Sequence, residues 1–160
     1  LAELTHGGFQ PVLDDPALGA APEAGVSLDP ARVTRLLLTS GKMYYALLAG
    51  RRERSLDSAA LVRVEQLYPF ARTELTAAFA RFPNLREMAW VQEEPWNMGA
   101  WHFMAPRLRR ILPNGVPLAY VGRPEAASPA TGSYKVHQTE EAELVQRAFG
   151  RWERSASGEG

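Results

Sequence analysis

Short apolar runs alternate with amphipathic stretches along the chain from residue 33 onward. Four runs predict buried strands, at residues 33–39, 60–64, 87–92 and 117–121. After each run, apolar residues recur three or four positions apart, which predicts helices over 43–54, 75–82, 98–112 and 138–150. Pro106 lies inside the third of these helices, where we expect a kink or two short helices. Strand–helix alternation repeated four times predicts an open α/β domain, with a mostly parallel sheet and helices on both faces.

The first part of the chain lacks this periodicity. Residues 1–31 carry many Gly and Pro breakers and are predicted to form an extended lead-in and linker. The ordered domain is expected to span residues 32–152, and residues 153–160 are expected to form a disordered tail. Residues 122–136 form a Gly/Pro/Ser loop, long enough to be a candidate functional element. Because the chain opens at Leu1, in loop-like sequence, we expect it to be a fragment of a longer protein.

Composition restricts the possible functions. Eighteen cations balance eighteen anions, so the formal net charge is zero, which argues against broad electrostatic capture of nucleic acid or of a membrane. The absence of cysteine excludes disulfides, thiol catalysis and cysteine-ligated metals. No apolar run approaches the roughly 20 residues that span a bilayer, and no signal peptide is visible. We therefore expect a soluble cytoplasmic protein without nucleic-acid or membrane partners.

Polar residues follow each predicted strand. In an open parallel sheet, functional groups gather beyond the carboxyl ends of the strands. The residues expected at that edge are Ser40, Gly41, Lys42, Glu65, Gln66, Glu93, Glu94, Gly122 and Arg123, with Ser128, Thr131, Lys135 and His137 on the following loop. Such mixed charges suit a binding site, an interface or a solvated edge, and the residues alone favour the last two.

No complete catalytic constellation is visible. Ser40-Gly41-Lys42 is not a nucleotide loop, because Leu36 stands where the first Gly is required and Met43 replaces the metal-binding Ser or Thr. Glu93 and Glu94 are adjacent, so on a strand they point to opposite faces and cannot act as a pair. The three histidines lack metal-site spacing, and His102 is expected to pack against the core.

Several longer motifs are similar to the decarboxylating, thiamine-diphosphate-dependent component of 2-oxoglutarate dehydrogenase. They are Thr5–Val12, Leu38–Tyr45, Arg63–Phe70, Trp90–Trp101, and Gly122–Pro124 continuing to Lys135–His137. These segments occur in the family's order and cover about residues 3–150. The chain thus resembles the transketolase-like C-terminal domain of that component.

The resemblance implies a domain at the end of a much longer, homodimeric chain. Thiamine diphosphate and magnesium would bind between the two preceding domains, and their Gly-Asp-Gly signature is absent from this sequence. The parent would decarboxylate 2-oxoglutarate, or 2-oxoadipate in a relative of that preference, and pass the acyl group to a lipoyl-bearing succinyltransferase component. The chain itself is predicted to hold no catalytic, cofactor or metal-binding residue. It would supply scaffold and contacts to the preceding domains and the dimer partner.

An effector-binding role is the alternative. Actinobacterial relatives are known for an acetyl-CoA activator site in this domain, lined by basic residues. The matching candidates here are Arg35, Lys42, Arg51 and Arg123, for a CoA-like or nucleotide phosphate. Only one Arg stands in Gly122–Pro124, where regulated relatives are expected to carry two, which counts against that role. A third hypothesis is an independent small enzyme that uses Glu65, Glu93 or His137.

Overall fold

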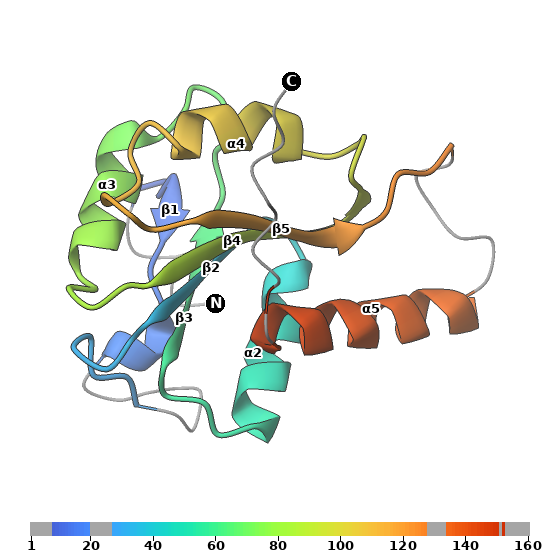
Figure 1. Ribbon diagram of the computed structural model, residues 1–160, viewed down its shortest axis with the longest axis horizontal. Coiled ribbons are helices and arrows are strands. Elements are labelled where there is room, and N and C mark those ends of the chain that lie inside the picture. Colours follow the sequence, from blue (N-terminus) through green and yellow to red (C-terminus); the bar gives the residue numbers. More distant parts are fainter. Residues whose placement is uncertain (1–7, 20–26, 128–133, 151, 153–160) are drawn as a thin grey trace.

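A five-stranded sheet runs through the molecule. The computed structural model describes residues 8–19, 27–127, 134–150 and 152, without the side chains of 134–138. The strands are β1 (Val12–Leu13), β2 (Arg35–Thr39), β3 (Ala59–Val64), β4 (Glu87–Pro95) and β5 (Leu118–Arg123), in the order β1-β3-β2-β4-β5 (Figure 1). The last four are mutually parallel, and β1 is antiparallel to β3. The predicted mostly parallel sheet is confirmed.

Helices cover both faces of the sheet, as predicted. α2 (Met43–Glu53) and α5 (Tyr134–Phe149) lie on one face, and α3 (Arg72–Ala80) and α4 (Trp101–Leu108) lie on the other (Figure 1). Successive residues of a strand point to opposite faces, so β2 feeds both cores. Leu36 and Leu38 pack in the cluster under α3 and α4, while Leu37 packs in the cluster under α2 and α5.

Several element boundaries differ from expectation, and three of the differences affect how the structure is interpreted. β4 continues three residues beyond Gln92 to Pro95, so Glu93 and Glu94 lie within the strand and not after it. α4 is one helix that contains Pro106, and the chain from 109 to 112 forms turns. α5 begins at Tyr134, earlier than the predicted start near residue 138. The pairing of β4 with β5 slips between Val91 and Pro95, where the two strands reach the edge of the sheet.

The lead-in contributes to the ordered structure, contrary to the boundary expected at Arg32. Val12 and Leu13 pair with Val64 and Arg63, and the short 3-10 helix η1 (Pro16–Leu18) follows. Ala17 is 1% exposed and belongs to the core under α3 and α4. The prediction missed this strand because two residues are too few to show a period-2 pattern.

The chain reverses its winding direction at β2. It passes from β2 to β3 on one side, then returns to place β4 on the other side of β2. The carboxyl ends of β2 and β4 are therefore a topological switch point, where open α/β sheets form their binding crevices.

Candidate functional site

Charged residues do meet at the carboxyl edge of the sheet, but they neutralise one another. Lys42 Nζ lies 2.9 Å from Glu93 Oε2, and Arg123 Nε lies 3.2 Å from Glu140 Oε2 on α5. The hydrogen bond with Glu93 is the main cause that raises the pKa of the Lys42 ammonium. The first pair joins the start of α2, just after β2, to β4. The second pair joins the end of β5 to α5. The arrangement favours an edge built for structural contacts.

A buried glutamine organises the turn that follows β4. Gln92 Oε1 accepts hydrogen bonds from Trp90 Nε1 (2.9 Å) and from the backbone N of Trp101 (3.0 Å). Its Nε2 donates to the carbonyl of Met98 at 2.8 Å. Gly99 adopts φ +68°, and a Cβ there would stand 2.7 Å from Gln92 Nε2, so the turn needs glycine twice over. These hydrogen bonds connect residues from one end of the Trp90–Trp101 motif to the other. They give the motif a structural role that requires no catalytic function.

Two side chains tie the next loop to this turn. The Tyr120 hydroxyl lies 3.0 Å from the carbonyl oxygens of Glu94 and Arg123, which accept its hydrogen bond. Burial raises the pKa of Tyr120 to about 12. Asn97 bonds both the N and the O of Ala126, at 3.1 and 3.0 Å. A groove of about 290 Å³ remains beside the turn, between Tyr68 and Phe103.

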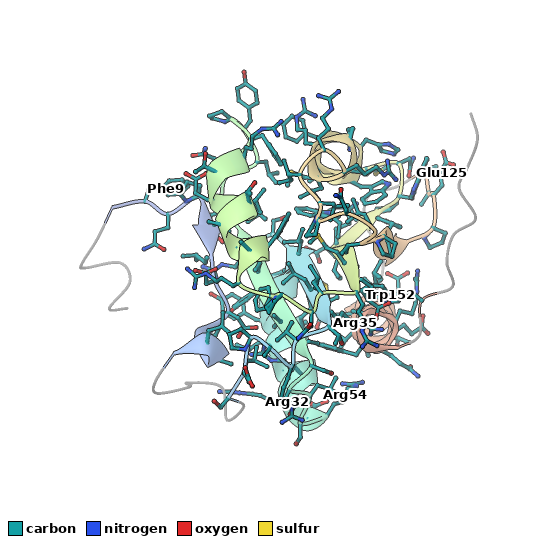
Figure 2. The ribbon with its side chains drawn as sticks, turned by 60° about the vertical axis from the view of Figure 1, so that its left-hand side comes forward. Phe9, Arg32, Arg35, Arg54, Glu125 and Trp152 are labelled. Carbon is teal, nitrogen blue, oxygen red and sulfur yellow. The ribbon has the colours of Figure 1, made fainter. Side chains whose placement is uncertain are left out.

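The four candidate effector-binding cations do not form one cluster. Lys42 and Arg123 belong to the carboxyl edge, but Arg35 is the first residue of β2 and lies at the opposite edge. Arg35 binds Glu87 Oε1 through Nε (2.7 Å) and Nη2 (2.5 Å), and its guanidinium lies 4.2 Å from the ring centre of Trp152 (Figure 2). Its Nη1 also donates to the carbonyl of Ala148, near the end of α5. Arg35 thus anchors the C-terminal helix.

Arg51 is enclosed in the protein. Its side chain is 0% exposed, and its guanidinium forms a two-point ion pair with the equally buried carboxylate of Asp15. Asp15 also accepts hydrogen bonds from the backbone N of Ala17 and of Leu61, at 2.9 and 2.6 Å. Arg51 therefore fastens the lead-in to α2 and β3, and no face of it is open to a ligand.

Other predicted residues are only partly placed. Ser128 and Thr131 lie outside the described residues, and so do the side chains of Lys135 and His137. The prediction that His102 packs against the core is wrong. His102 is exposed and meets the Trp96 ring edge-on, at 4.4 Å between ring centres.

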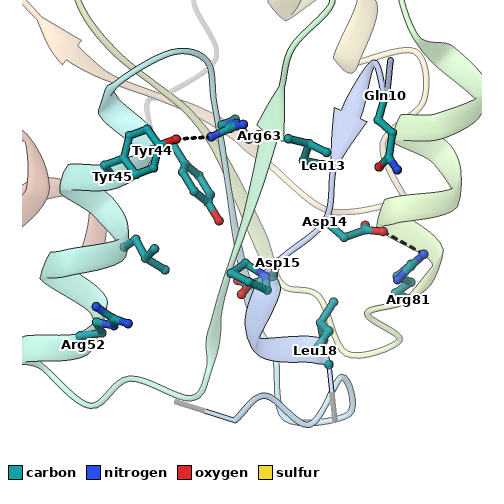
Figure 3. Close-up of a pocket in the computed structure, with 13 residues that line it drawn as sticks. Gln10, Leu13, Asp14, Asp15, Leu18, Tyr44, Tyr45, Arg52, Arg63 and Arg81 are labelled. Atoms are coloured by element: carbon teal, nitrogen blue, oxygen red, sulfur yellow. Dashed lines mark hydrogen bonds and ion pairs between the residues drawn. The ribbon is translucent and has the colours of Figure 1, made fainter. Parts of the chain in front are cut away.

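A larger groove opens where β1 meets β3 and α2 (Figure 3). It encloses about 530 Å³ and is lined by Gln10, Leu13, Asp14, Asp15, Pro16, Leu18, Gly19, Tyr44, Tyr45, Leu48, Arg52, Arg63 and Arg81. Three arginines reach it, from α2, from β3 and from the residue that follows α3. None of them was among the candidate residues, because the sequence separates them by up to 29 positions (Arg52 to Arg81) and only the edge strand brings them together.

Arg63 is the best-defined group of this groove. Its guanidinium lies 5.0 Å from the ring centre of Tyr44, and its Nη1 donates to the Tyr45 hydroxyl at 3.0 Å. Its Nε lies 2.6 Å from Glu65 Oε1. Burial alone would lower the pKa of Arg63, but the bond to Tyr45 and the charge of Glu65 outweigh it and raise the pKa. On the other wall, Arg81 pairs with Asp14 at 2.9 Å.

The order and direction of the strands define an open α/β domain, and its likeness to a solved structure makes it one of the transketolase C-terminal type. A solved chain with this fold, titled "Split gene transketolase, inactive beta4 tetramer", aligns with a TM-score of 0.51 at 20% identity. The alignment covers 72% of this chain and 39% of that one.

Sequence comparison identifies the family. The model described as "2-oxoglutarate dehydrogenase C-terminal" matches residues 1–149. The 2-oxoglutarate dehydrogenase E1 components of Shouchella clausii and Bacillus mycoides are each 44% identical to the chain, and that of Geobacillus kaustophilus is 43% identical. Each alignment covers 92% of this chain but 15% of the relative's length. The chain belongs to the 2-oxoglutarate dehydrogenase C-terminal family, which confirms the resemblance seen in its motifs.

The carboxylates of the described residues do not form a metal site. Among them, no three His, Asp or Glu side chains are grouped to hold a metal ion. The carboxylates of Glu87, Glu93 and Glu140 each face a cation of the chain itself. Among the described residues, magnesium therefore finds no set of carboxylate or histidine ligands. No helix within the described ranges has the length and apolar character of a membrane span.

Proposed function

We propose that the chain is the C-terminal structural and dimerisation domain of a cytoplasmic 2-oxoglutarate dehydrogenase component. The observation that carries this proposal is the match of residues 1–149 to a family whose compared members are about six times longer. The parent would decarboxylate 2-oxoglutarate with thiamine diphosphate and magnesium held in its preceding domains. It would then transfer the succinyl group to a lipoyl-bearing carrier.

The interactions in the chain support a structural role. Near the switch point, Gln92 and Tyr120 hydrogen-bond to the backbone of the adjoining loops, and Lys42 pairs with Glu93 of β4. A domain of this kind contributes to activity by fixing the geometry of its neighbours. The residues here would position and pack, while the reacting groups would belong to the preceding domains.

The test compares the isolated chain with the full-length parent. Each is supplied with 2-oxoglutarate, thiamine diphosphate and magnesium, and release of CO₂ is measured. We expect turnover from the parent and none from the isolated chain. Turnover by the isolated chain that is lost in Glu93→Gln would overturn the proposal. The ratio of kcat/KM for 2-oxoglutarate and 2-oxoadipate in the parent decides its substrate preference, and sedimentation of a parent lacking this domain tests the dimer role.

A second candidate function is effector binding, and the groove between β1 and α2 favours it. Arg52 and Arg63 provide cations for a phosphate, and the Tyr44 and Tyr45 rings line the same hollow (Figure 3). Arginine binds phosphate through charge-assisted, often bidentate hydrogen bonds. The expected ligand is a CoA-like or nucleotide phosphate, as in the effector-binding hypothesis drawn from the sequence. The residues that would bind it are different. Arg35 and Arg51 anchor other parts of the chain instead.

Calorimetric titration of the full-length protein with acetyl-CoA, CoA and AMP tests this candidate. We expect binding that weakens as salt rises, and that Arg52→Gln loses about tenfold in affinity, as for one charge-assisted contact. Arg54→Gln, at the residue that caps the end of α2 outside the groove, is the control. If none of the three ligands binds, or if Arg52→Gln binds them as tightly as the unsubstituted protein does, the groove is not an effector site.

A further inference from the structure

The large exposed apolar side chains gather at one edge of the sheet. Among the described residues they are Phe9, Tyr45, Tyr68 and Trp96, which are 71%, 61%, 81% and 42% exposed. Tyr68 comes shortly after β3, Trp96 directly follows β4, and Tyr45 lies in the first turn of α2, after β2. Single exposed apolar residues are common on a protein surface, but several at one edge mark an interaction surface. The carboxyl edge of the sheet is therefore distinguished from the other faces of the domain.

The chain enters the domain at this same edge. β1 runs antiparallel to β3, so the residues before β1 lie beyond the carboxyl end of β3. The backbone N–H groups of Glu65 and Gln66 both donate to the carbonyl oxygen of Pro11, at 2.9 and 3.0 Å. Phe9, two residues earlier, lies on the outside of the molecule (Figure 2). Any domain that precedes this one in the polypeptide is therefore attached at the carboxyl edge.

Two of the exposed rings are held in place by α4. Tyr68 meets the Phe103 ring at 6.4 Å between ring centres, and Trp96 meets the His102 ring at 4.4 Å. His102 and Phe103 are neighbours in the first turn of α4, so both exposed rings flank the same turn. The groove of about 290 Å³ between Tyr68 and Phe103 adds an apolar recess. Side chains that are fixed in advance lose little conformational entropy when a second surface covers them.

The charged groups of this edge can be covered as well. Lys42 pairs with Glu93 and Arg123 pairs with Glu140, so each of these charges has an opposite charge within the domain. Removing one charge from water without a partner is costly, whereas a pair of opposite charges needs no matching charge on the covering surface. Interfaces between domains of one chain are more polar than those of permanent complexes. Exposed rings among paired charges suit such an interface.

We propose that this edge surface, made of Phe9, Tyr68, Trp96 and Phe103, packs against the part of the parent polypeptide that precedes this chain. The inference rests on the proposed function, because it takes the chain to be the end of a longer protein. The chain covers 15% of the length of the compared relatives, so most of such a parent lies outside it. A domain tethered next to Phe9 is held at high effective concentration beside these rings. The rings are then exposed in this chain and covered in the parent.

Two other occupants fit the edge surface less well. A second copy would have to reach the rings past the chain's own preceding segment, which leaves the molecule beside them. A small molecule would find a recess of about 290 Å³, close to the lower limit of ligand pockets, and charges that are already paired. The preceding part of the polypeptide is favoured over both, because its attachment brings it to this edge.

The test places a photo-activated cross-linker at the edge surface of the full-length parent. Tyr68→p-benzoylphenylalanine keeps an aromatic ring at that position. The control is Arg86→p-benzoylphenylalanine, because Arg86 is exposed at the opposite edge, just before β4. The parent is prepared as a mixture of isotopically light and heavy chains, so mass spectrometry separates cross-links within one chain from those between copies. We expect position 68 to cross-link to residues that precede this chain in the same polypeptide, and position 86 to give a small fraction of that yield.

Oxidation by hydroxyl radicals checks the edge surface without any substitution. In the unsubstituted parent, we expect Tyr68 and Trp96 to be oxidised far more slowly than after unfolding in urea, and as slowly as the buried Trp90 and Trp101. Oxidation of Tyr68 and Trp96 at nearly the rate of the unfolded chain would show that the edge is open to solvent, and would overturn the inference.

The cross-links also separate the inference from the proposed function. Absence of cross-links from position 68, or cross-links that stay within this domain or reach only a second copy, overturns the inference. So does an equal yield from position 86, because the preceding part would then show no preference for the carboxyl edge. Release of CO₂ from 2-oxoglutarate by the unsubstituted parent is measured separately. Its absence contradicts the proposed function and leaves the positions of the cross-links to decide the inference.

Discussion

Asp15 and Arg51 show how one buried pair can join distant parts of the chain. The two charges are 36 residues apart in sequence, and neither side chain is exposed. Asp15 receives four hydrogen bonds, two from Arg51 and two from backbone N–H groups. A buried ion pair needs such hydrogen bonds, because each ion loses its hydration. On the Asp15 carboxylate both oxygens are bonded, whereas Arg51 Nε is buried without a hydrogen-bond partner among the described residues. The pair thus ties the lead-in to α2 and to the central part of β3.

Removing one member of the pair should be costly. Arg51→Met leaves the Asp15 carboxylate buried without its counter-charge, so we expect the free energy of unfolding to fall by about 3–5 kcal/mol. Replacing both, with Arg51→Met and Asp15→Leu, should recover most of the loss. Urea denaturation measures each value, and Arg54→Met, on the exposed end of the same helix, should change it by about 0–1 kcal/mol. A loss below about 1 kcal/mol in Arg51→Met would mean that Arg51 is solvated.

Tyr120 makes stability depend on alkaline pH. Burial raises its pKa to about 12 in the folded protein, above the value of 10.0 that is usual for tyrosine. The neutral phenol is therefore favoured by folding. Its contribution is complete below about pH 10 and is lost as pH rises toward 12, because the unfolded chain releases the proton first.

The comparison with Tyr120→Phe isolates this effect. We expect thermal stability of the unsubstituted protein to fall more steeply between pH 10 and 12 than that of Tyr120→Phe, which has no proton to lose there. Tyr68→Phe removes an exposed phenol and serves as the control. Parallel pH profiles for all three proteins would show that Tyr120 titrates as a solvated tyrosine.

At the level of elements, the contact between α2 and α5 depends on a glycine. Gly50 lies in α2, and a Cβ at that position would stand 2.3 Å from Val145 Cγ1 on α5. The helices can approach this closely only because Gly50 has no side chain. Val145 is β-branched and stiff, so it cannot easily turn away.

Gly50→Ala reverses the usual effect of such a change in a helix. Alanine normally stabilises a helix interior by about 0.5–1 kcal/mol relative to glycine, but here overpacking should destabilise the protein by about 1–3 kcal/mol. Adding Val145→Ala makes room and should restore part of that loss. Gly8→Ala, with nothing within 4 Å of the added carbon, is the neutral control in the same denaturation series. Stabilisation by Gly50→Ala would show that α5 is not packed against α2 at this position.

For the whole molecule, the lead-in decides where the folded unit begins. Val12–Leu13 closes the edge of the sheet and Asp15 reaches Arg51, so the unit extends well before the expected boundary at Arg32. A chain that starts at residue 8 keeps both features. A chain that starts at residue 32 loses the edge strand and leaves Arg51 as an unpaired buried cation.

We expect the chain starting at residue 8 to unfold at the same urea concentration as the complete 160-residue chain. The chain starting at residue 32 should lose about 3 kcal/mol or more, the cost of an unpaired buried charge, or fail to fold. Adding Arg51→Met to this shorter chain should recover stability. If the shorter chain is as stable as the complete one, the boundary at Arg32 is correct.

The class of fold and the family could both be predicted from the amino-acid sequence. Apolar runs and helical stripes are local, periodic signals, and they placed β2 to β5 and the helices that follow them to within a few residues. Buried Trp101, 7% exposed, follows from the same helical spacing. The family motifs are also linear strings, so they could be read without a structure.

Which charges pair with one another could be learned only from the folded chain. Arg35 meets Glu87 across 52 residues, and Arg51 meets Asp15 across 36, so no local pattern distinguishes these arginines from those on the surface. The groove lined by Arg52, Arg63 and Arg81 exists because a two-residue strand completes the sheet edge. A periodic pattern in the sequence indicates which side of a helix or strand is buried. Which two charged side chains form an ion pair depends instead on the order and direction of the strands. Those are properties of the folded chain, because the sheet brings together residues that the sequence keeps apart.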